Sequence, residues 1–134
     1  MYRHADEARP AECCGLVGGR GSRTETVYPL RNVARDPLTN YEAAPEELFV
    51  AQRTMRERGE ELLGIYHSHP RAADPVPSEK DVRLAYYPSA VYFILGGLRE
   101  DGAGRRRLGA FRLFEAEGRW EAVQYKLVDD QETH

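Results

Sequence analysis

Apolar residues fall into short runs separated by polar turns, and their spacing changes along the chain. Short apolar runs bounded by glycine or polar clusters predict strands, whereas apolar residues at every third or fourth position predict helices. The predicted order is helix, two strands, helix, strand, helix and three strands, over residues 1–9, 13–18, 24–30, 45–59, 62–66, 78–86, 91–95, 108–115 and 120–128. The glycine-rich segment 18–22 is expected to turn the first two strands into a hairpin. We therefore expect an α/β fold of the α+β type, with one mixed, partly antiparallel sheet flanked by helices.

Length and composition place the chain among folded globular proteins. Its 134 residues, 41% hydrophobic and 31% charged, predict a single domain over 1–134 that buries a core without a disulfide or metal staple. The longest apolar run, 91–98, is too short to cross a membrane, and the charged N-terminus is not a secretory signal. A net charge of -3 argues against a dedicated nucleic-acid binder. Two adjacent cysteines, Cys13 and Cys14, with no CxxC pair, suggest a reducing, cytoplasmic location.

Two histidines follow the apolar strand 62–66 directly. His67 and His69 are two residues apart, so in an extended chain both side chains project from one face and both can reach one metal ion. Pro70 then turns the chain away and leaves that end of the strand open. Taken alone, such a pair is as often two ordinary polar residues at a strand exit as a metal site.

Asp81 is the natural third ligand, because catalytic zinc takes three protein ligands and leaves a fourth position for water. The spacing from Ser78 to Asp81 also fits a helix capping box, which in isolation is the more common explanation. The hydroxyl of Ser78 can cap the helix or point into a cleft. Glu12 lies far away in sequence, and only a fold that joins the two strands makes it a catalytic base.

The complete spacing resembles a known family. His67-Ser-His-Pro70, seven residues, Ser78, two residues and Asp81 resemble the JAMM signature of the MPN-plus metallopeptidases, which pairs with a glutamate on an upstream strand. Residues 10–18, with Glu12, resemble the upstream element of the small bacterial members, and 64–67 also fits. The resemblance covers roughly residues 1–98. It implies an MPN fold, similar to that of cytidine deaminases, although the family's usual first strand and longer first helix would be missing here.

The resemblance implies a role for each matched residue. His67, His69 and Asp81 would bind one zinc ion, Glu12 would hold the zinc-bound water as general base and then protonate the leaving amine, and Ser78 would hydrogen-bond the oxyanion. The implied reaction is hydrolysis of an amide or isopeptide bond after the Gly-Gly tail of a ubiquitin-like or sulfur-carrier protein, which would be the partner.

Two other functions are considered. A non-catalytic MPN scaffold that binds protein partners is the alternative, but such relatives usually lack one or more ligands, whereas all five positions are present here. A zinc nucleoside deaminase needs H-x-E together with P-C-x-x-C, and this chain has no such cysteines.

Overall fold

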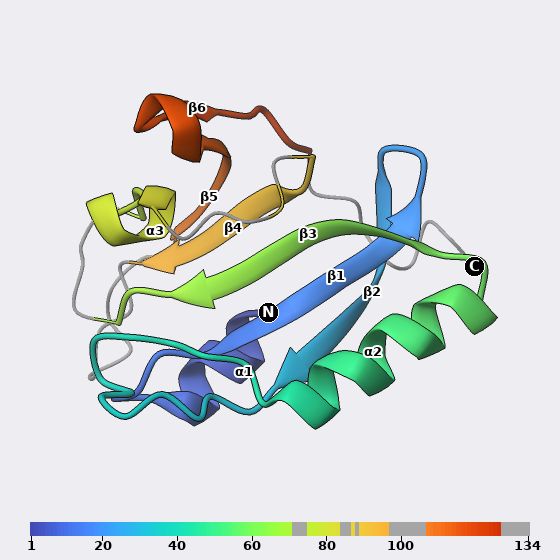
Figure 1. Ribbon diagram of the computed structural model, residues 1–134, viewed down its shortest axis with the longest axis horizontal. Coiled ribbons are helices and arrows are strands. Elements are labelled where there is room, and N and C mark those ends of the chain that lie inside the picture. Colours follow the sequence, from blue (N-terminus) through green and yellow to red (C-terminus); the bar gives the residue numbers. More distant parts are fainter. Residues whose placement is uncertain (71–74, 84–86, 88, 97–106, 127–134) are drawn as a thin grey trace.

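The computed structural model describes residues 1–70, 75–83, 87, 89–96 and 107–126. The elements follow the predicted order (Figure 1). They are α1 (Tyr2–Ala8), β1 (Cys14–Arg20), β2 (Arg23–Leu30), α2 (Pro45–Glu57), β3 (Glu61–Ser68), α3 (Glu79–Arg83), β4 (Val91–Gly96), β5 (Arg107–Phe114), a 3-10 turn (Glu115–Glu117) and β6 (Arg119–Ala122). The predicted ends of the third helix (84–86) and of the last strand (127–128) lie outside the described residues. In the described part of the chain, no helix has the length and apolar character needed to span a bilayer.

One six-stranded sheet forms the centre of the fold, in the order β2-β1-β3-β4-β5-β6. The β3–β4 pair is parallel and every other neighbouring pair is antiparallel. This confirms the mixed, partly antiparallel sheet expected from the sequence. The parallel pair requires a crossover between β3 and β4, and α3 lies in that connection.

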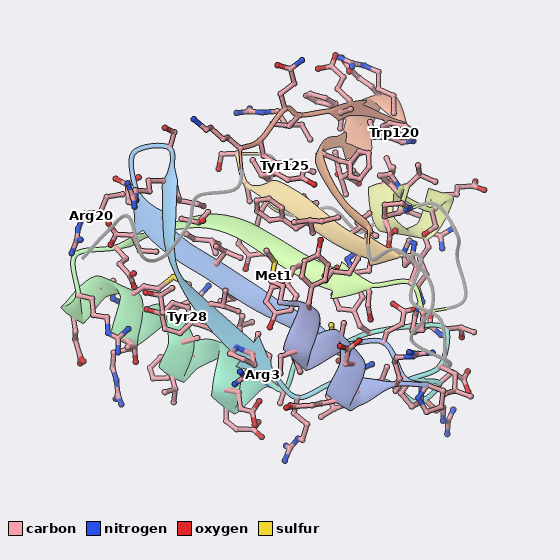
Figure 2. All side chains as sticks on the ribbon, turned by 180° about the vertical axis from the view of Figure 1, so that it is seen from behind. Met1, Arg3, Arg20, Tyr28, Trp120 and Tyr125 are labelled. Atoms are coloured by element: carbon pink, nitrogen blue, oxygen red, sulfur yellow. The ribbon has the colours of Figure 1, made fainter. Side chains whose placement is uncertain are left out.

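Helices cover both faces of the sheet. Helices α2 and α3 pack on one face and α1 packs on the other, as Figures 1 and 2 show from opposite sides. Alternate residues of β1 supply the two cores, because successive strand residues point to opposite faces. Cys14 and Leu16 pack toward α2, whereas Cys13 and Val17 pack toward α1. The two adjacent cysteines are therefore buried in different layers, and both are free thiols.

The expected turn over 18–22 is wrong in extent. Gly18 and Gly19 belong to β1, and the pairing with β2 shifts register between them, as at a β-bulge. A Cβ at Gly19 would lie 2.1 Å from the carbonyl oxygen of Arg23, so only glycine permits this close approach. The hairpin turn is confined to Gly21, which has a φ of +59°, and Ser22. Gly19, which was predicted only as part of the turn, thus belongs to the strand β1.

Candidate metal centre

The candidate site lies where the C-terminal end of β3 meets the start of β1. Strand β3 continues past the predicted residue 66, so His67 is its penultimate residue and pairs with Cys14 of the antiparallel β1. Extending this register by two residues brings Glu12 opposite His69. Because side chains two residues apart share a face, Glu12 and both histidines point to the same side of the sheet. The topology therefore joins the two motifs that are more than fifty residues apart in sequence.

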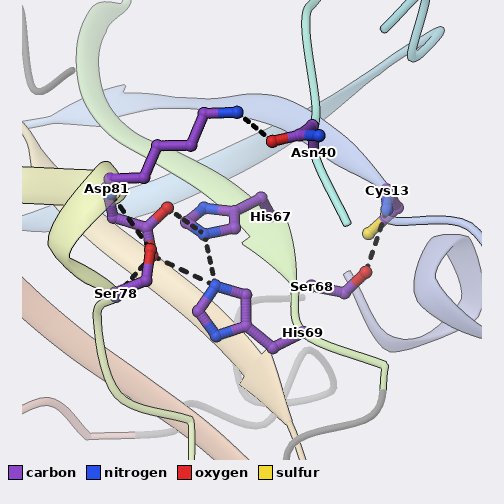
Figure 3. Close-up of polar contacts among 8 residues, drawn as sticks. Cys13, Asn40, His67, Ser68, His69, Ser78 and Asp81 are labelled. Atoms are coloured by element: carbon purple, nitrogen blue, oxygen red, sulfur yellow. Dashed lines mark hydrogen bonds and ion pairs between the residues drawn. The ribbon is translucent and has the colours of Figure 1, made fainter. Parts of the chain in front are cut away.

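The side chains of His67, His69 and Asp81 converge on one point (Figure 3). The Nε2 atoms of the two histidines are 3.0 Å apart. Asp81 Oδ1 lies 3.2 Å from His67 Nε2, and Asp81 Oδ2 lies 3.1 Å from His69 Nε2. A tetrahedral zinc ion with ligands at about 2.0–2.1 Å separates its ligand atoms by roughly 3.3 Å. The three side chains therefore have the spacing and the donor types of a two-histidine, one-carboxylate zinc site.

Asp81 and Ser78 also form the capping box that the sequence permits. The Asp81 N–H donates to Ser78 Oγ at 3.1 Å, and the Ser78 N–H donates to Asp81 Oδ2 at 2.8 Å. The carboxylate of Asp81 accepts from Ser78 and still faces both histidines, so the capping box and a metal-binding role are compatible at this residue. The reciprocal bonds fix the first turn of α3 and hold the carboxylate in position.

Electrostatics favour a deprotonated Asp81 and a neutral His67. Burial raises the pKa of Asp81, but hydrogen bonds from His67 and His69 outweigh it and hold this pKa well below its ordinary value. The fully buried ring of His67 has a lowered pKa because burial disfavours its charged form. Burial lowers the pKa of His69 as well, yet the hydrogen bond and charge of Asp81 outweigh that effect and raise it. His67, His69 and Asp81 could hold a cation, which would then replace the proton on His69.

Glu12 lies beside the two histidines and forms with them a second group that could hold a metal ion. Its carboxylate lies within 4.8 Å of ring nitrogens of both histidines, whereas Asp81 contacts the two rings directly. Glu12 is only 7% exposed. Burial raises its pKa to about 7; the positive charge of His69 opposes this rise and the negative charge of Asp81 adds to it. Two neighbouring carboxyls with pKa values driven in opposite directions are typical of a site in which one exchanges protons and the other stays ionised.

The ring of His67 is oriented by stacking. Tyr41 lies against it with ring centroids 4.5 Å apart and an interplanar angle of 22°. In the part of the chain that the structure describes, His67 Nδ1 is the single buried side-chain nitrogen or oxygen without a hydrogen-bond partner. Nδ1 of a metal-binding histidine usually donates to a neighbouring oxygen. Here the tyrosine face supplies the orientation instead, and His67 Nε2 is the atom directed at the convergence point.

A cleft of about 910 Å³ opens beside these residues. Glu12, His69, Ser78 and Asp81 are among its lining residues, and the segment 34–43 supplies many of the others. The Ser78 Oγ accepts the Asp81 N–H, so its own hydroxyl hydrogen is free to donate to a group in the cleft. A reacting carbonyl in the cleft can therefore meet an acidic residue, a histidine and a hydroxyl donor at the same end.

Sequence patterns did not reveal the residues that support this site. The ring of Tyr41 and the buried hydroxyl of Ser68 both act on it, and Ser68 Oγ accepts the N–H of Cys13 at 2.9 Å. The side-chain amide of Asn32 contacts the backbone of Glu12 from the segment after β2. No local signal marks Asn32 or Tyr41, because their partners are distant in sequence.

The chain is similar in sequence to a desampylase and to a CysO-cysteine peptidase. It is 44% identical over 87 residues to the desampylase of Haloferax volcanii, a match that covers 63% of this chain and 62% of that protein. It is 38% identical over 97 residues to the CysO-cysteine peptidase of Mycobacterium tuberculosis, covering 71% of this chain and 65% of that protein. The chain thus spans less than two thirds of the length of these relatives.

Solved structures share the fold of the chain, and one family model covers most of its length. The chain superposes on a solution structure from Desulfitobacterium hafniense with a TM-score of 0.82, at 33% identity, covering 100% of this chain and 90% of that one. A JAB1/MPN domain protein from Archaeoglobus fulgidus shares the fold at a TM-score of 0.55 and 19% identity, covering 95% and 89% of the two chains. The model that describes prokaryotic homologs of the JAB domain matches residues 1–109. Because that match takes in both β1 and the histidine strand, the chain belongs to this family of prokaryotic JAB-domain homologs.

Proposed function

We propose that the protein is a zinc-dependent peptidase that hydrolyses an amide or isopeptide bond. The observation that carries this proposal is the convergence of His67, His69 and Asp81 at 3.0–3.2 Å, with the buried Glu12 beside them. In this proposal the two histidines and Asp81 hold one zinc ion, and Glu12 stays outside the ligand set. An ion held there supplies Lewis-acid chemistry, which activates water and polarises a carbonyl.

The chain's own residues carry the proton transfers. Glu12 accepts a proton from the attacking water as the C–O bond forms, and it returns that proton to the leaving amine as the C–N bond breaks. Burial raises the pKa of Glu12 in the site without a metal, so this carboxylate is a stronger base there than an exposed one. The hydroxyl of Ser78 donates to the oxygen that becomes negative, and one such donor lowers the barrier by about 3 kcal/mol. The hydrogen bonds from His67 and His69 that Asp81 accepts without a metal would give way to ligation of the ion.

The proposed substrate is a conjugate of a ubiquitin-like or sulfur-carrier protein, cut after its C-terminal Gly-Gly. The names of the relatives support this choice, since one is a CysO-cysteine peptidase and another a probable TtuB-protein conjugate cleaving protease. A single catalytic domain over 1–134 and a cytoplasmic location remain predictions.

The test uses zinc-loaded protein and fusions of Gly-Gly-ended carriers to a short peptide. Mass spectrometry of the products would give a new carboxyl terminus at the second glycine, and a Gly-Gly to Gly-Val fusion serves as the matched control. Cleavage that zinc restores after chelation supports the proposal. A zinc-loaded protein that leaves every fusion intact would contradict it and would favour the scaffold alternative.

A further inference from the structure

The segment between β2 and α2, residues 31–44, forms the loop that lines the cleft, and we call it the cleft loop. It carries Tyr41, whose ring stacks on His67. It is linked to α3 by Lys80 Nζ, which donates to Asn40 Oδ1 (Figure 3). Fourteen residues without a helix need tertiary contacts to hold one shape. Backbone bonds such as Val33 N–H to Glu42 O supply some of them, and one side chain supplies four more.

That side chain is Asn32, whose amide makes four hydrogen bonds to the backbone. Nδ2 donates to the carbonyl oxygens of Glu12 at 3.0 Å and Asn40 at 2.9 Å. Oδ1 accepts the N–H groups of Ala34 at 2.9 Å and Glu42 at 3.0 Å. Two donor hydrogens and two acceptor sites are all that an asparagine amide has, so every one is used. The partners also fix the orientation of the amide, because backbone carbonyls only accept and backbone N–H groups only donate.

Three of the four partners belong to Glu12 itself or to the neighbours of Tyr41. Asn40 and Glu42 flank Tyr41, so Asn32 holds the short stretch from which the tyrosine ring reaches His67. The carbonyl of Glu12 is the other partner, and the Glu12 N–H donates to Pro37 of the same loop at 2.7 Å. Glu12 lies ahead of β1. The loop therefore holds both backbone polar groups of a residue whose side chain must be placed accurately.

We infer that Asn32 is the positioning residue for Glu12. This inference rests on the proposed function, because it assigns Asn32 an effect on the proton-transferring carboxylate. Asn32 touches neither the convergence point nor a group in the reaction. It acts by fixing the backbone from which Glu12 projects, and a misplacement of about 1 Å at such a group can lower the rate on the order of 100-fold.

Asn32→Asp is the sharpest test, because it keeps the shape and both acceptor bonds but places a carboxylate oxygen against two carbonyls. Asn32→Ala removes all four bonds and serves as the second variant if the aspartate variant fails to fold. Thr26→Val is the matched control, since Thr26 donates to the buried Glu60 at 2.6 Å, four residues along β2 from its end at the cleft. All three variants lose side-chain bonds to buried groups, but only two of them touch the cleft loop.

Three quantities are measured on each full-length variant: zinc affinity, kcat and KM on the Gly-Gly fusion, and amide hydrogen exchange at Glu12. For Asn32→Asp we expect zinc affinity and KM within about threefold of the wild type, a kcat lowered about 10- to 100-fold, and faster exchange at Glu12. Thr26→Val should keep the wild-type kcat and the wild-type exchange at Glu12.

Several results would overturn the inference. An unchanged kcat in both Asn32 variants would do so, as would an equal loss in Thr26→Val, which would indicate general destabilisation. A parallel fall of zinc affinity and kcat would assign Asn32 to the metal ligands rather than to Glu12. If the zinc-loaded wild type cleaves no fusion, the proposed function fails by itself. Unchanged amide exchange at Glu12 in both Asn32 variants would then separately refute the role of Asn32.

Discussion

Glu12→Gln replaces a buried carboxyl by an uncharged side chain of the same shape. In the metal-free protein, burial raises the pKa of Glu12 from 4.5 to about 7. At 1.36 kcal/mol for each pKa unit, this difference corresponds to about 3 kcal/mol, an upper limit because the charge of His69 changes together with that of Glu12. The folded protein holds this proton more tightly than the unfolded chain. Its free energy of unfolding therefore falls as the pH rises from about 4.5 through about 7, where the buried carboxyl ionises.

Glutamine cannot ionise, so the free energy of unfolding of the variant does not fall with pH at this position. We expect metal-depleted Glu12→Gln and wild type to have nearly equal stability at pH 4.5. At pH 8 the variant should be more stable by up to about 3 kcal/mol. Urea denaturation in the presence of a chelator, repeated from pH 4.5 to 8, measures the difference directly. A variant that is less stable than the wild type at pH 8, or a difference that does not change with pH, would refute the reasoning.

Asp81→Asn is the control, because it should change the free energy of unfolding in the opposite direction. Hydrogen bonds from the histidines outweigh burial and lower the pKa of Asp81 below its unfolded value of 3.8. Its carboxylate therefore stabilises the fold above pH 3.8, and this contribution fades only as the pH falls through the lowered pKa. Asp81→Asn should destabilise the metal-free protein at pH 7, where Glu12→Gln stabilises it.

Three further substitutions test the supporting structure. Ser68→Ala should lower the free energy of unfolding by about 1–3 kcal/mol in urea titrations, because the buried N–H of Cys13 loses its acceptor; no loss would contradict that role. Gly15→Ala places a Cβ 2.2 Å from the ring of the fully buried Tyr66, so thermal melting should show a loss of about 2 kcal/mol or more; a wild-type melting temperature would exclude the clash. Tyr41→Leu should weaken zinc binding about tenfold in competition titrations, and unchanged affinity would mean that stacking does not orient the buried histidine.

Much of the fold was predictable because each element carries its own local pattern. Apolar runs located β3 and β4, and Pro45 followed by two glutamates located the start of α2. The pattern failed at Gly19, because a strand bulge and a turn both favour glycine and only the pairing of β1 with β2 distinguishes them. Tertiary contacts, not local preference, decided this position.

The candidate site shows the same division. The sequence predicted that the two histidines and Asp81 lie together. The structure places their Nε2 and carboxylate oxygen atoms 3.0–3.2 Å apart. The same spacing fitted a capping box, and the structure contains that as well, so sequence reasoning had treated two compatible roles as rivals. Asn32 was missed because each of its four hydrogen bonds goes to a backbone group. Every residue type offers such a group, so the sequence carries no pattern that identifies the partners.

The central claim is that two histidines and Asp81 hold the metal while Glu12 does not. Calorimetric titration of zinc into the metal-free wild type, Glu12→Gln, His69→Ala and Asp81→Ala tests it most directly. The account predicts one zinc per chain in the wild type and in Glu12→Gln, and no tight site in the other two variants. Loss of zinc from Glu12→Gln together with its retention by Asp81→Ala would contradict the account and would make Glu12 the third ligand.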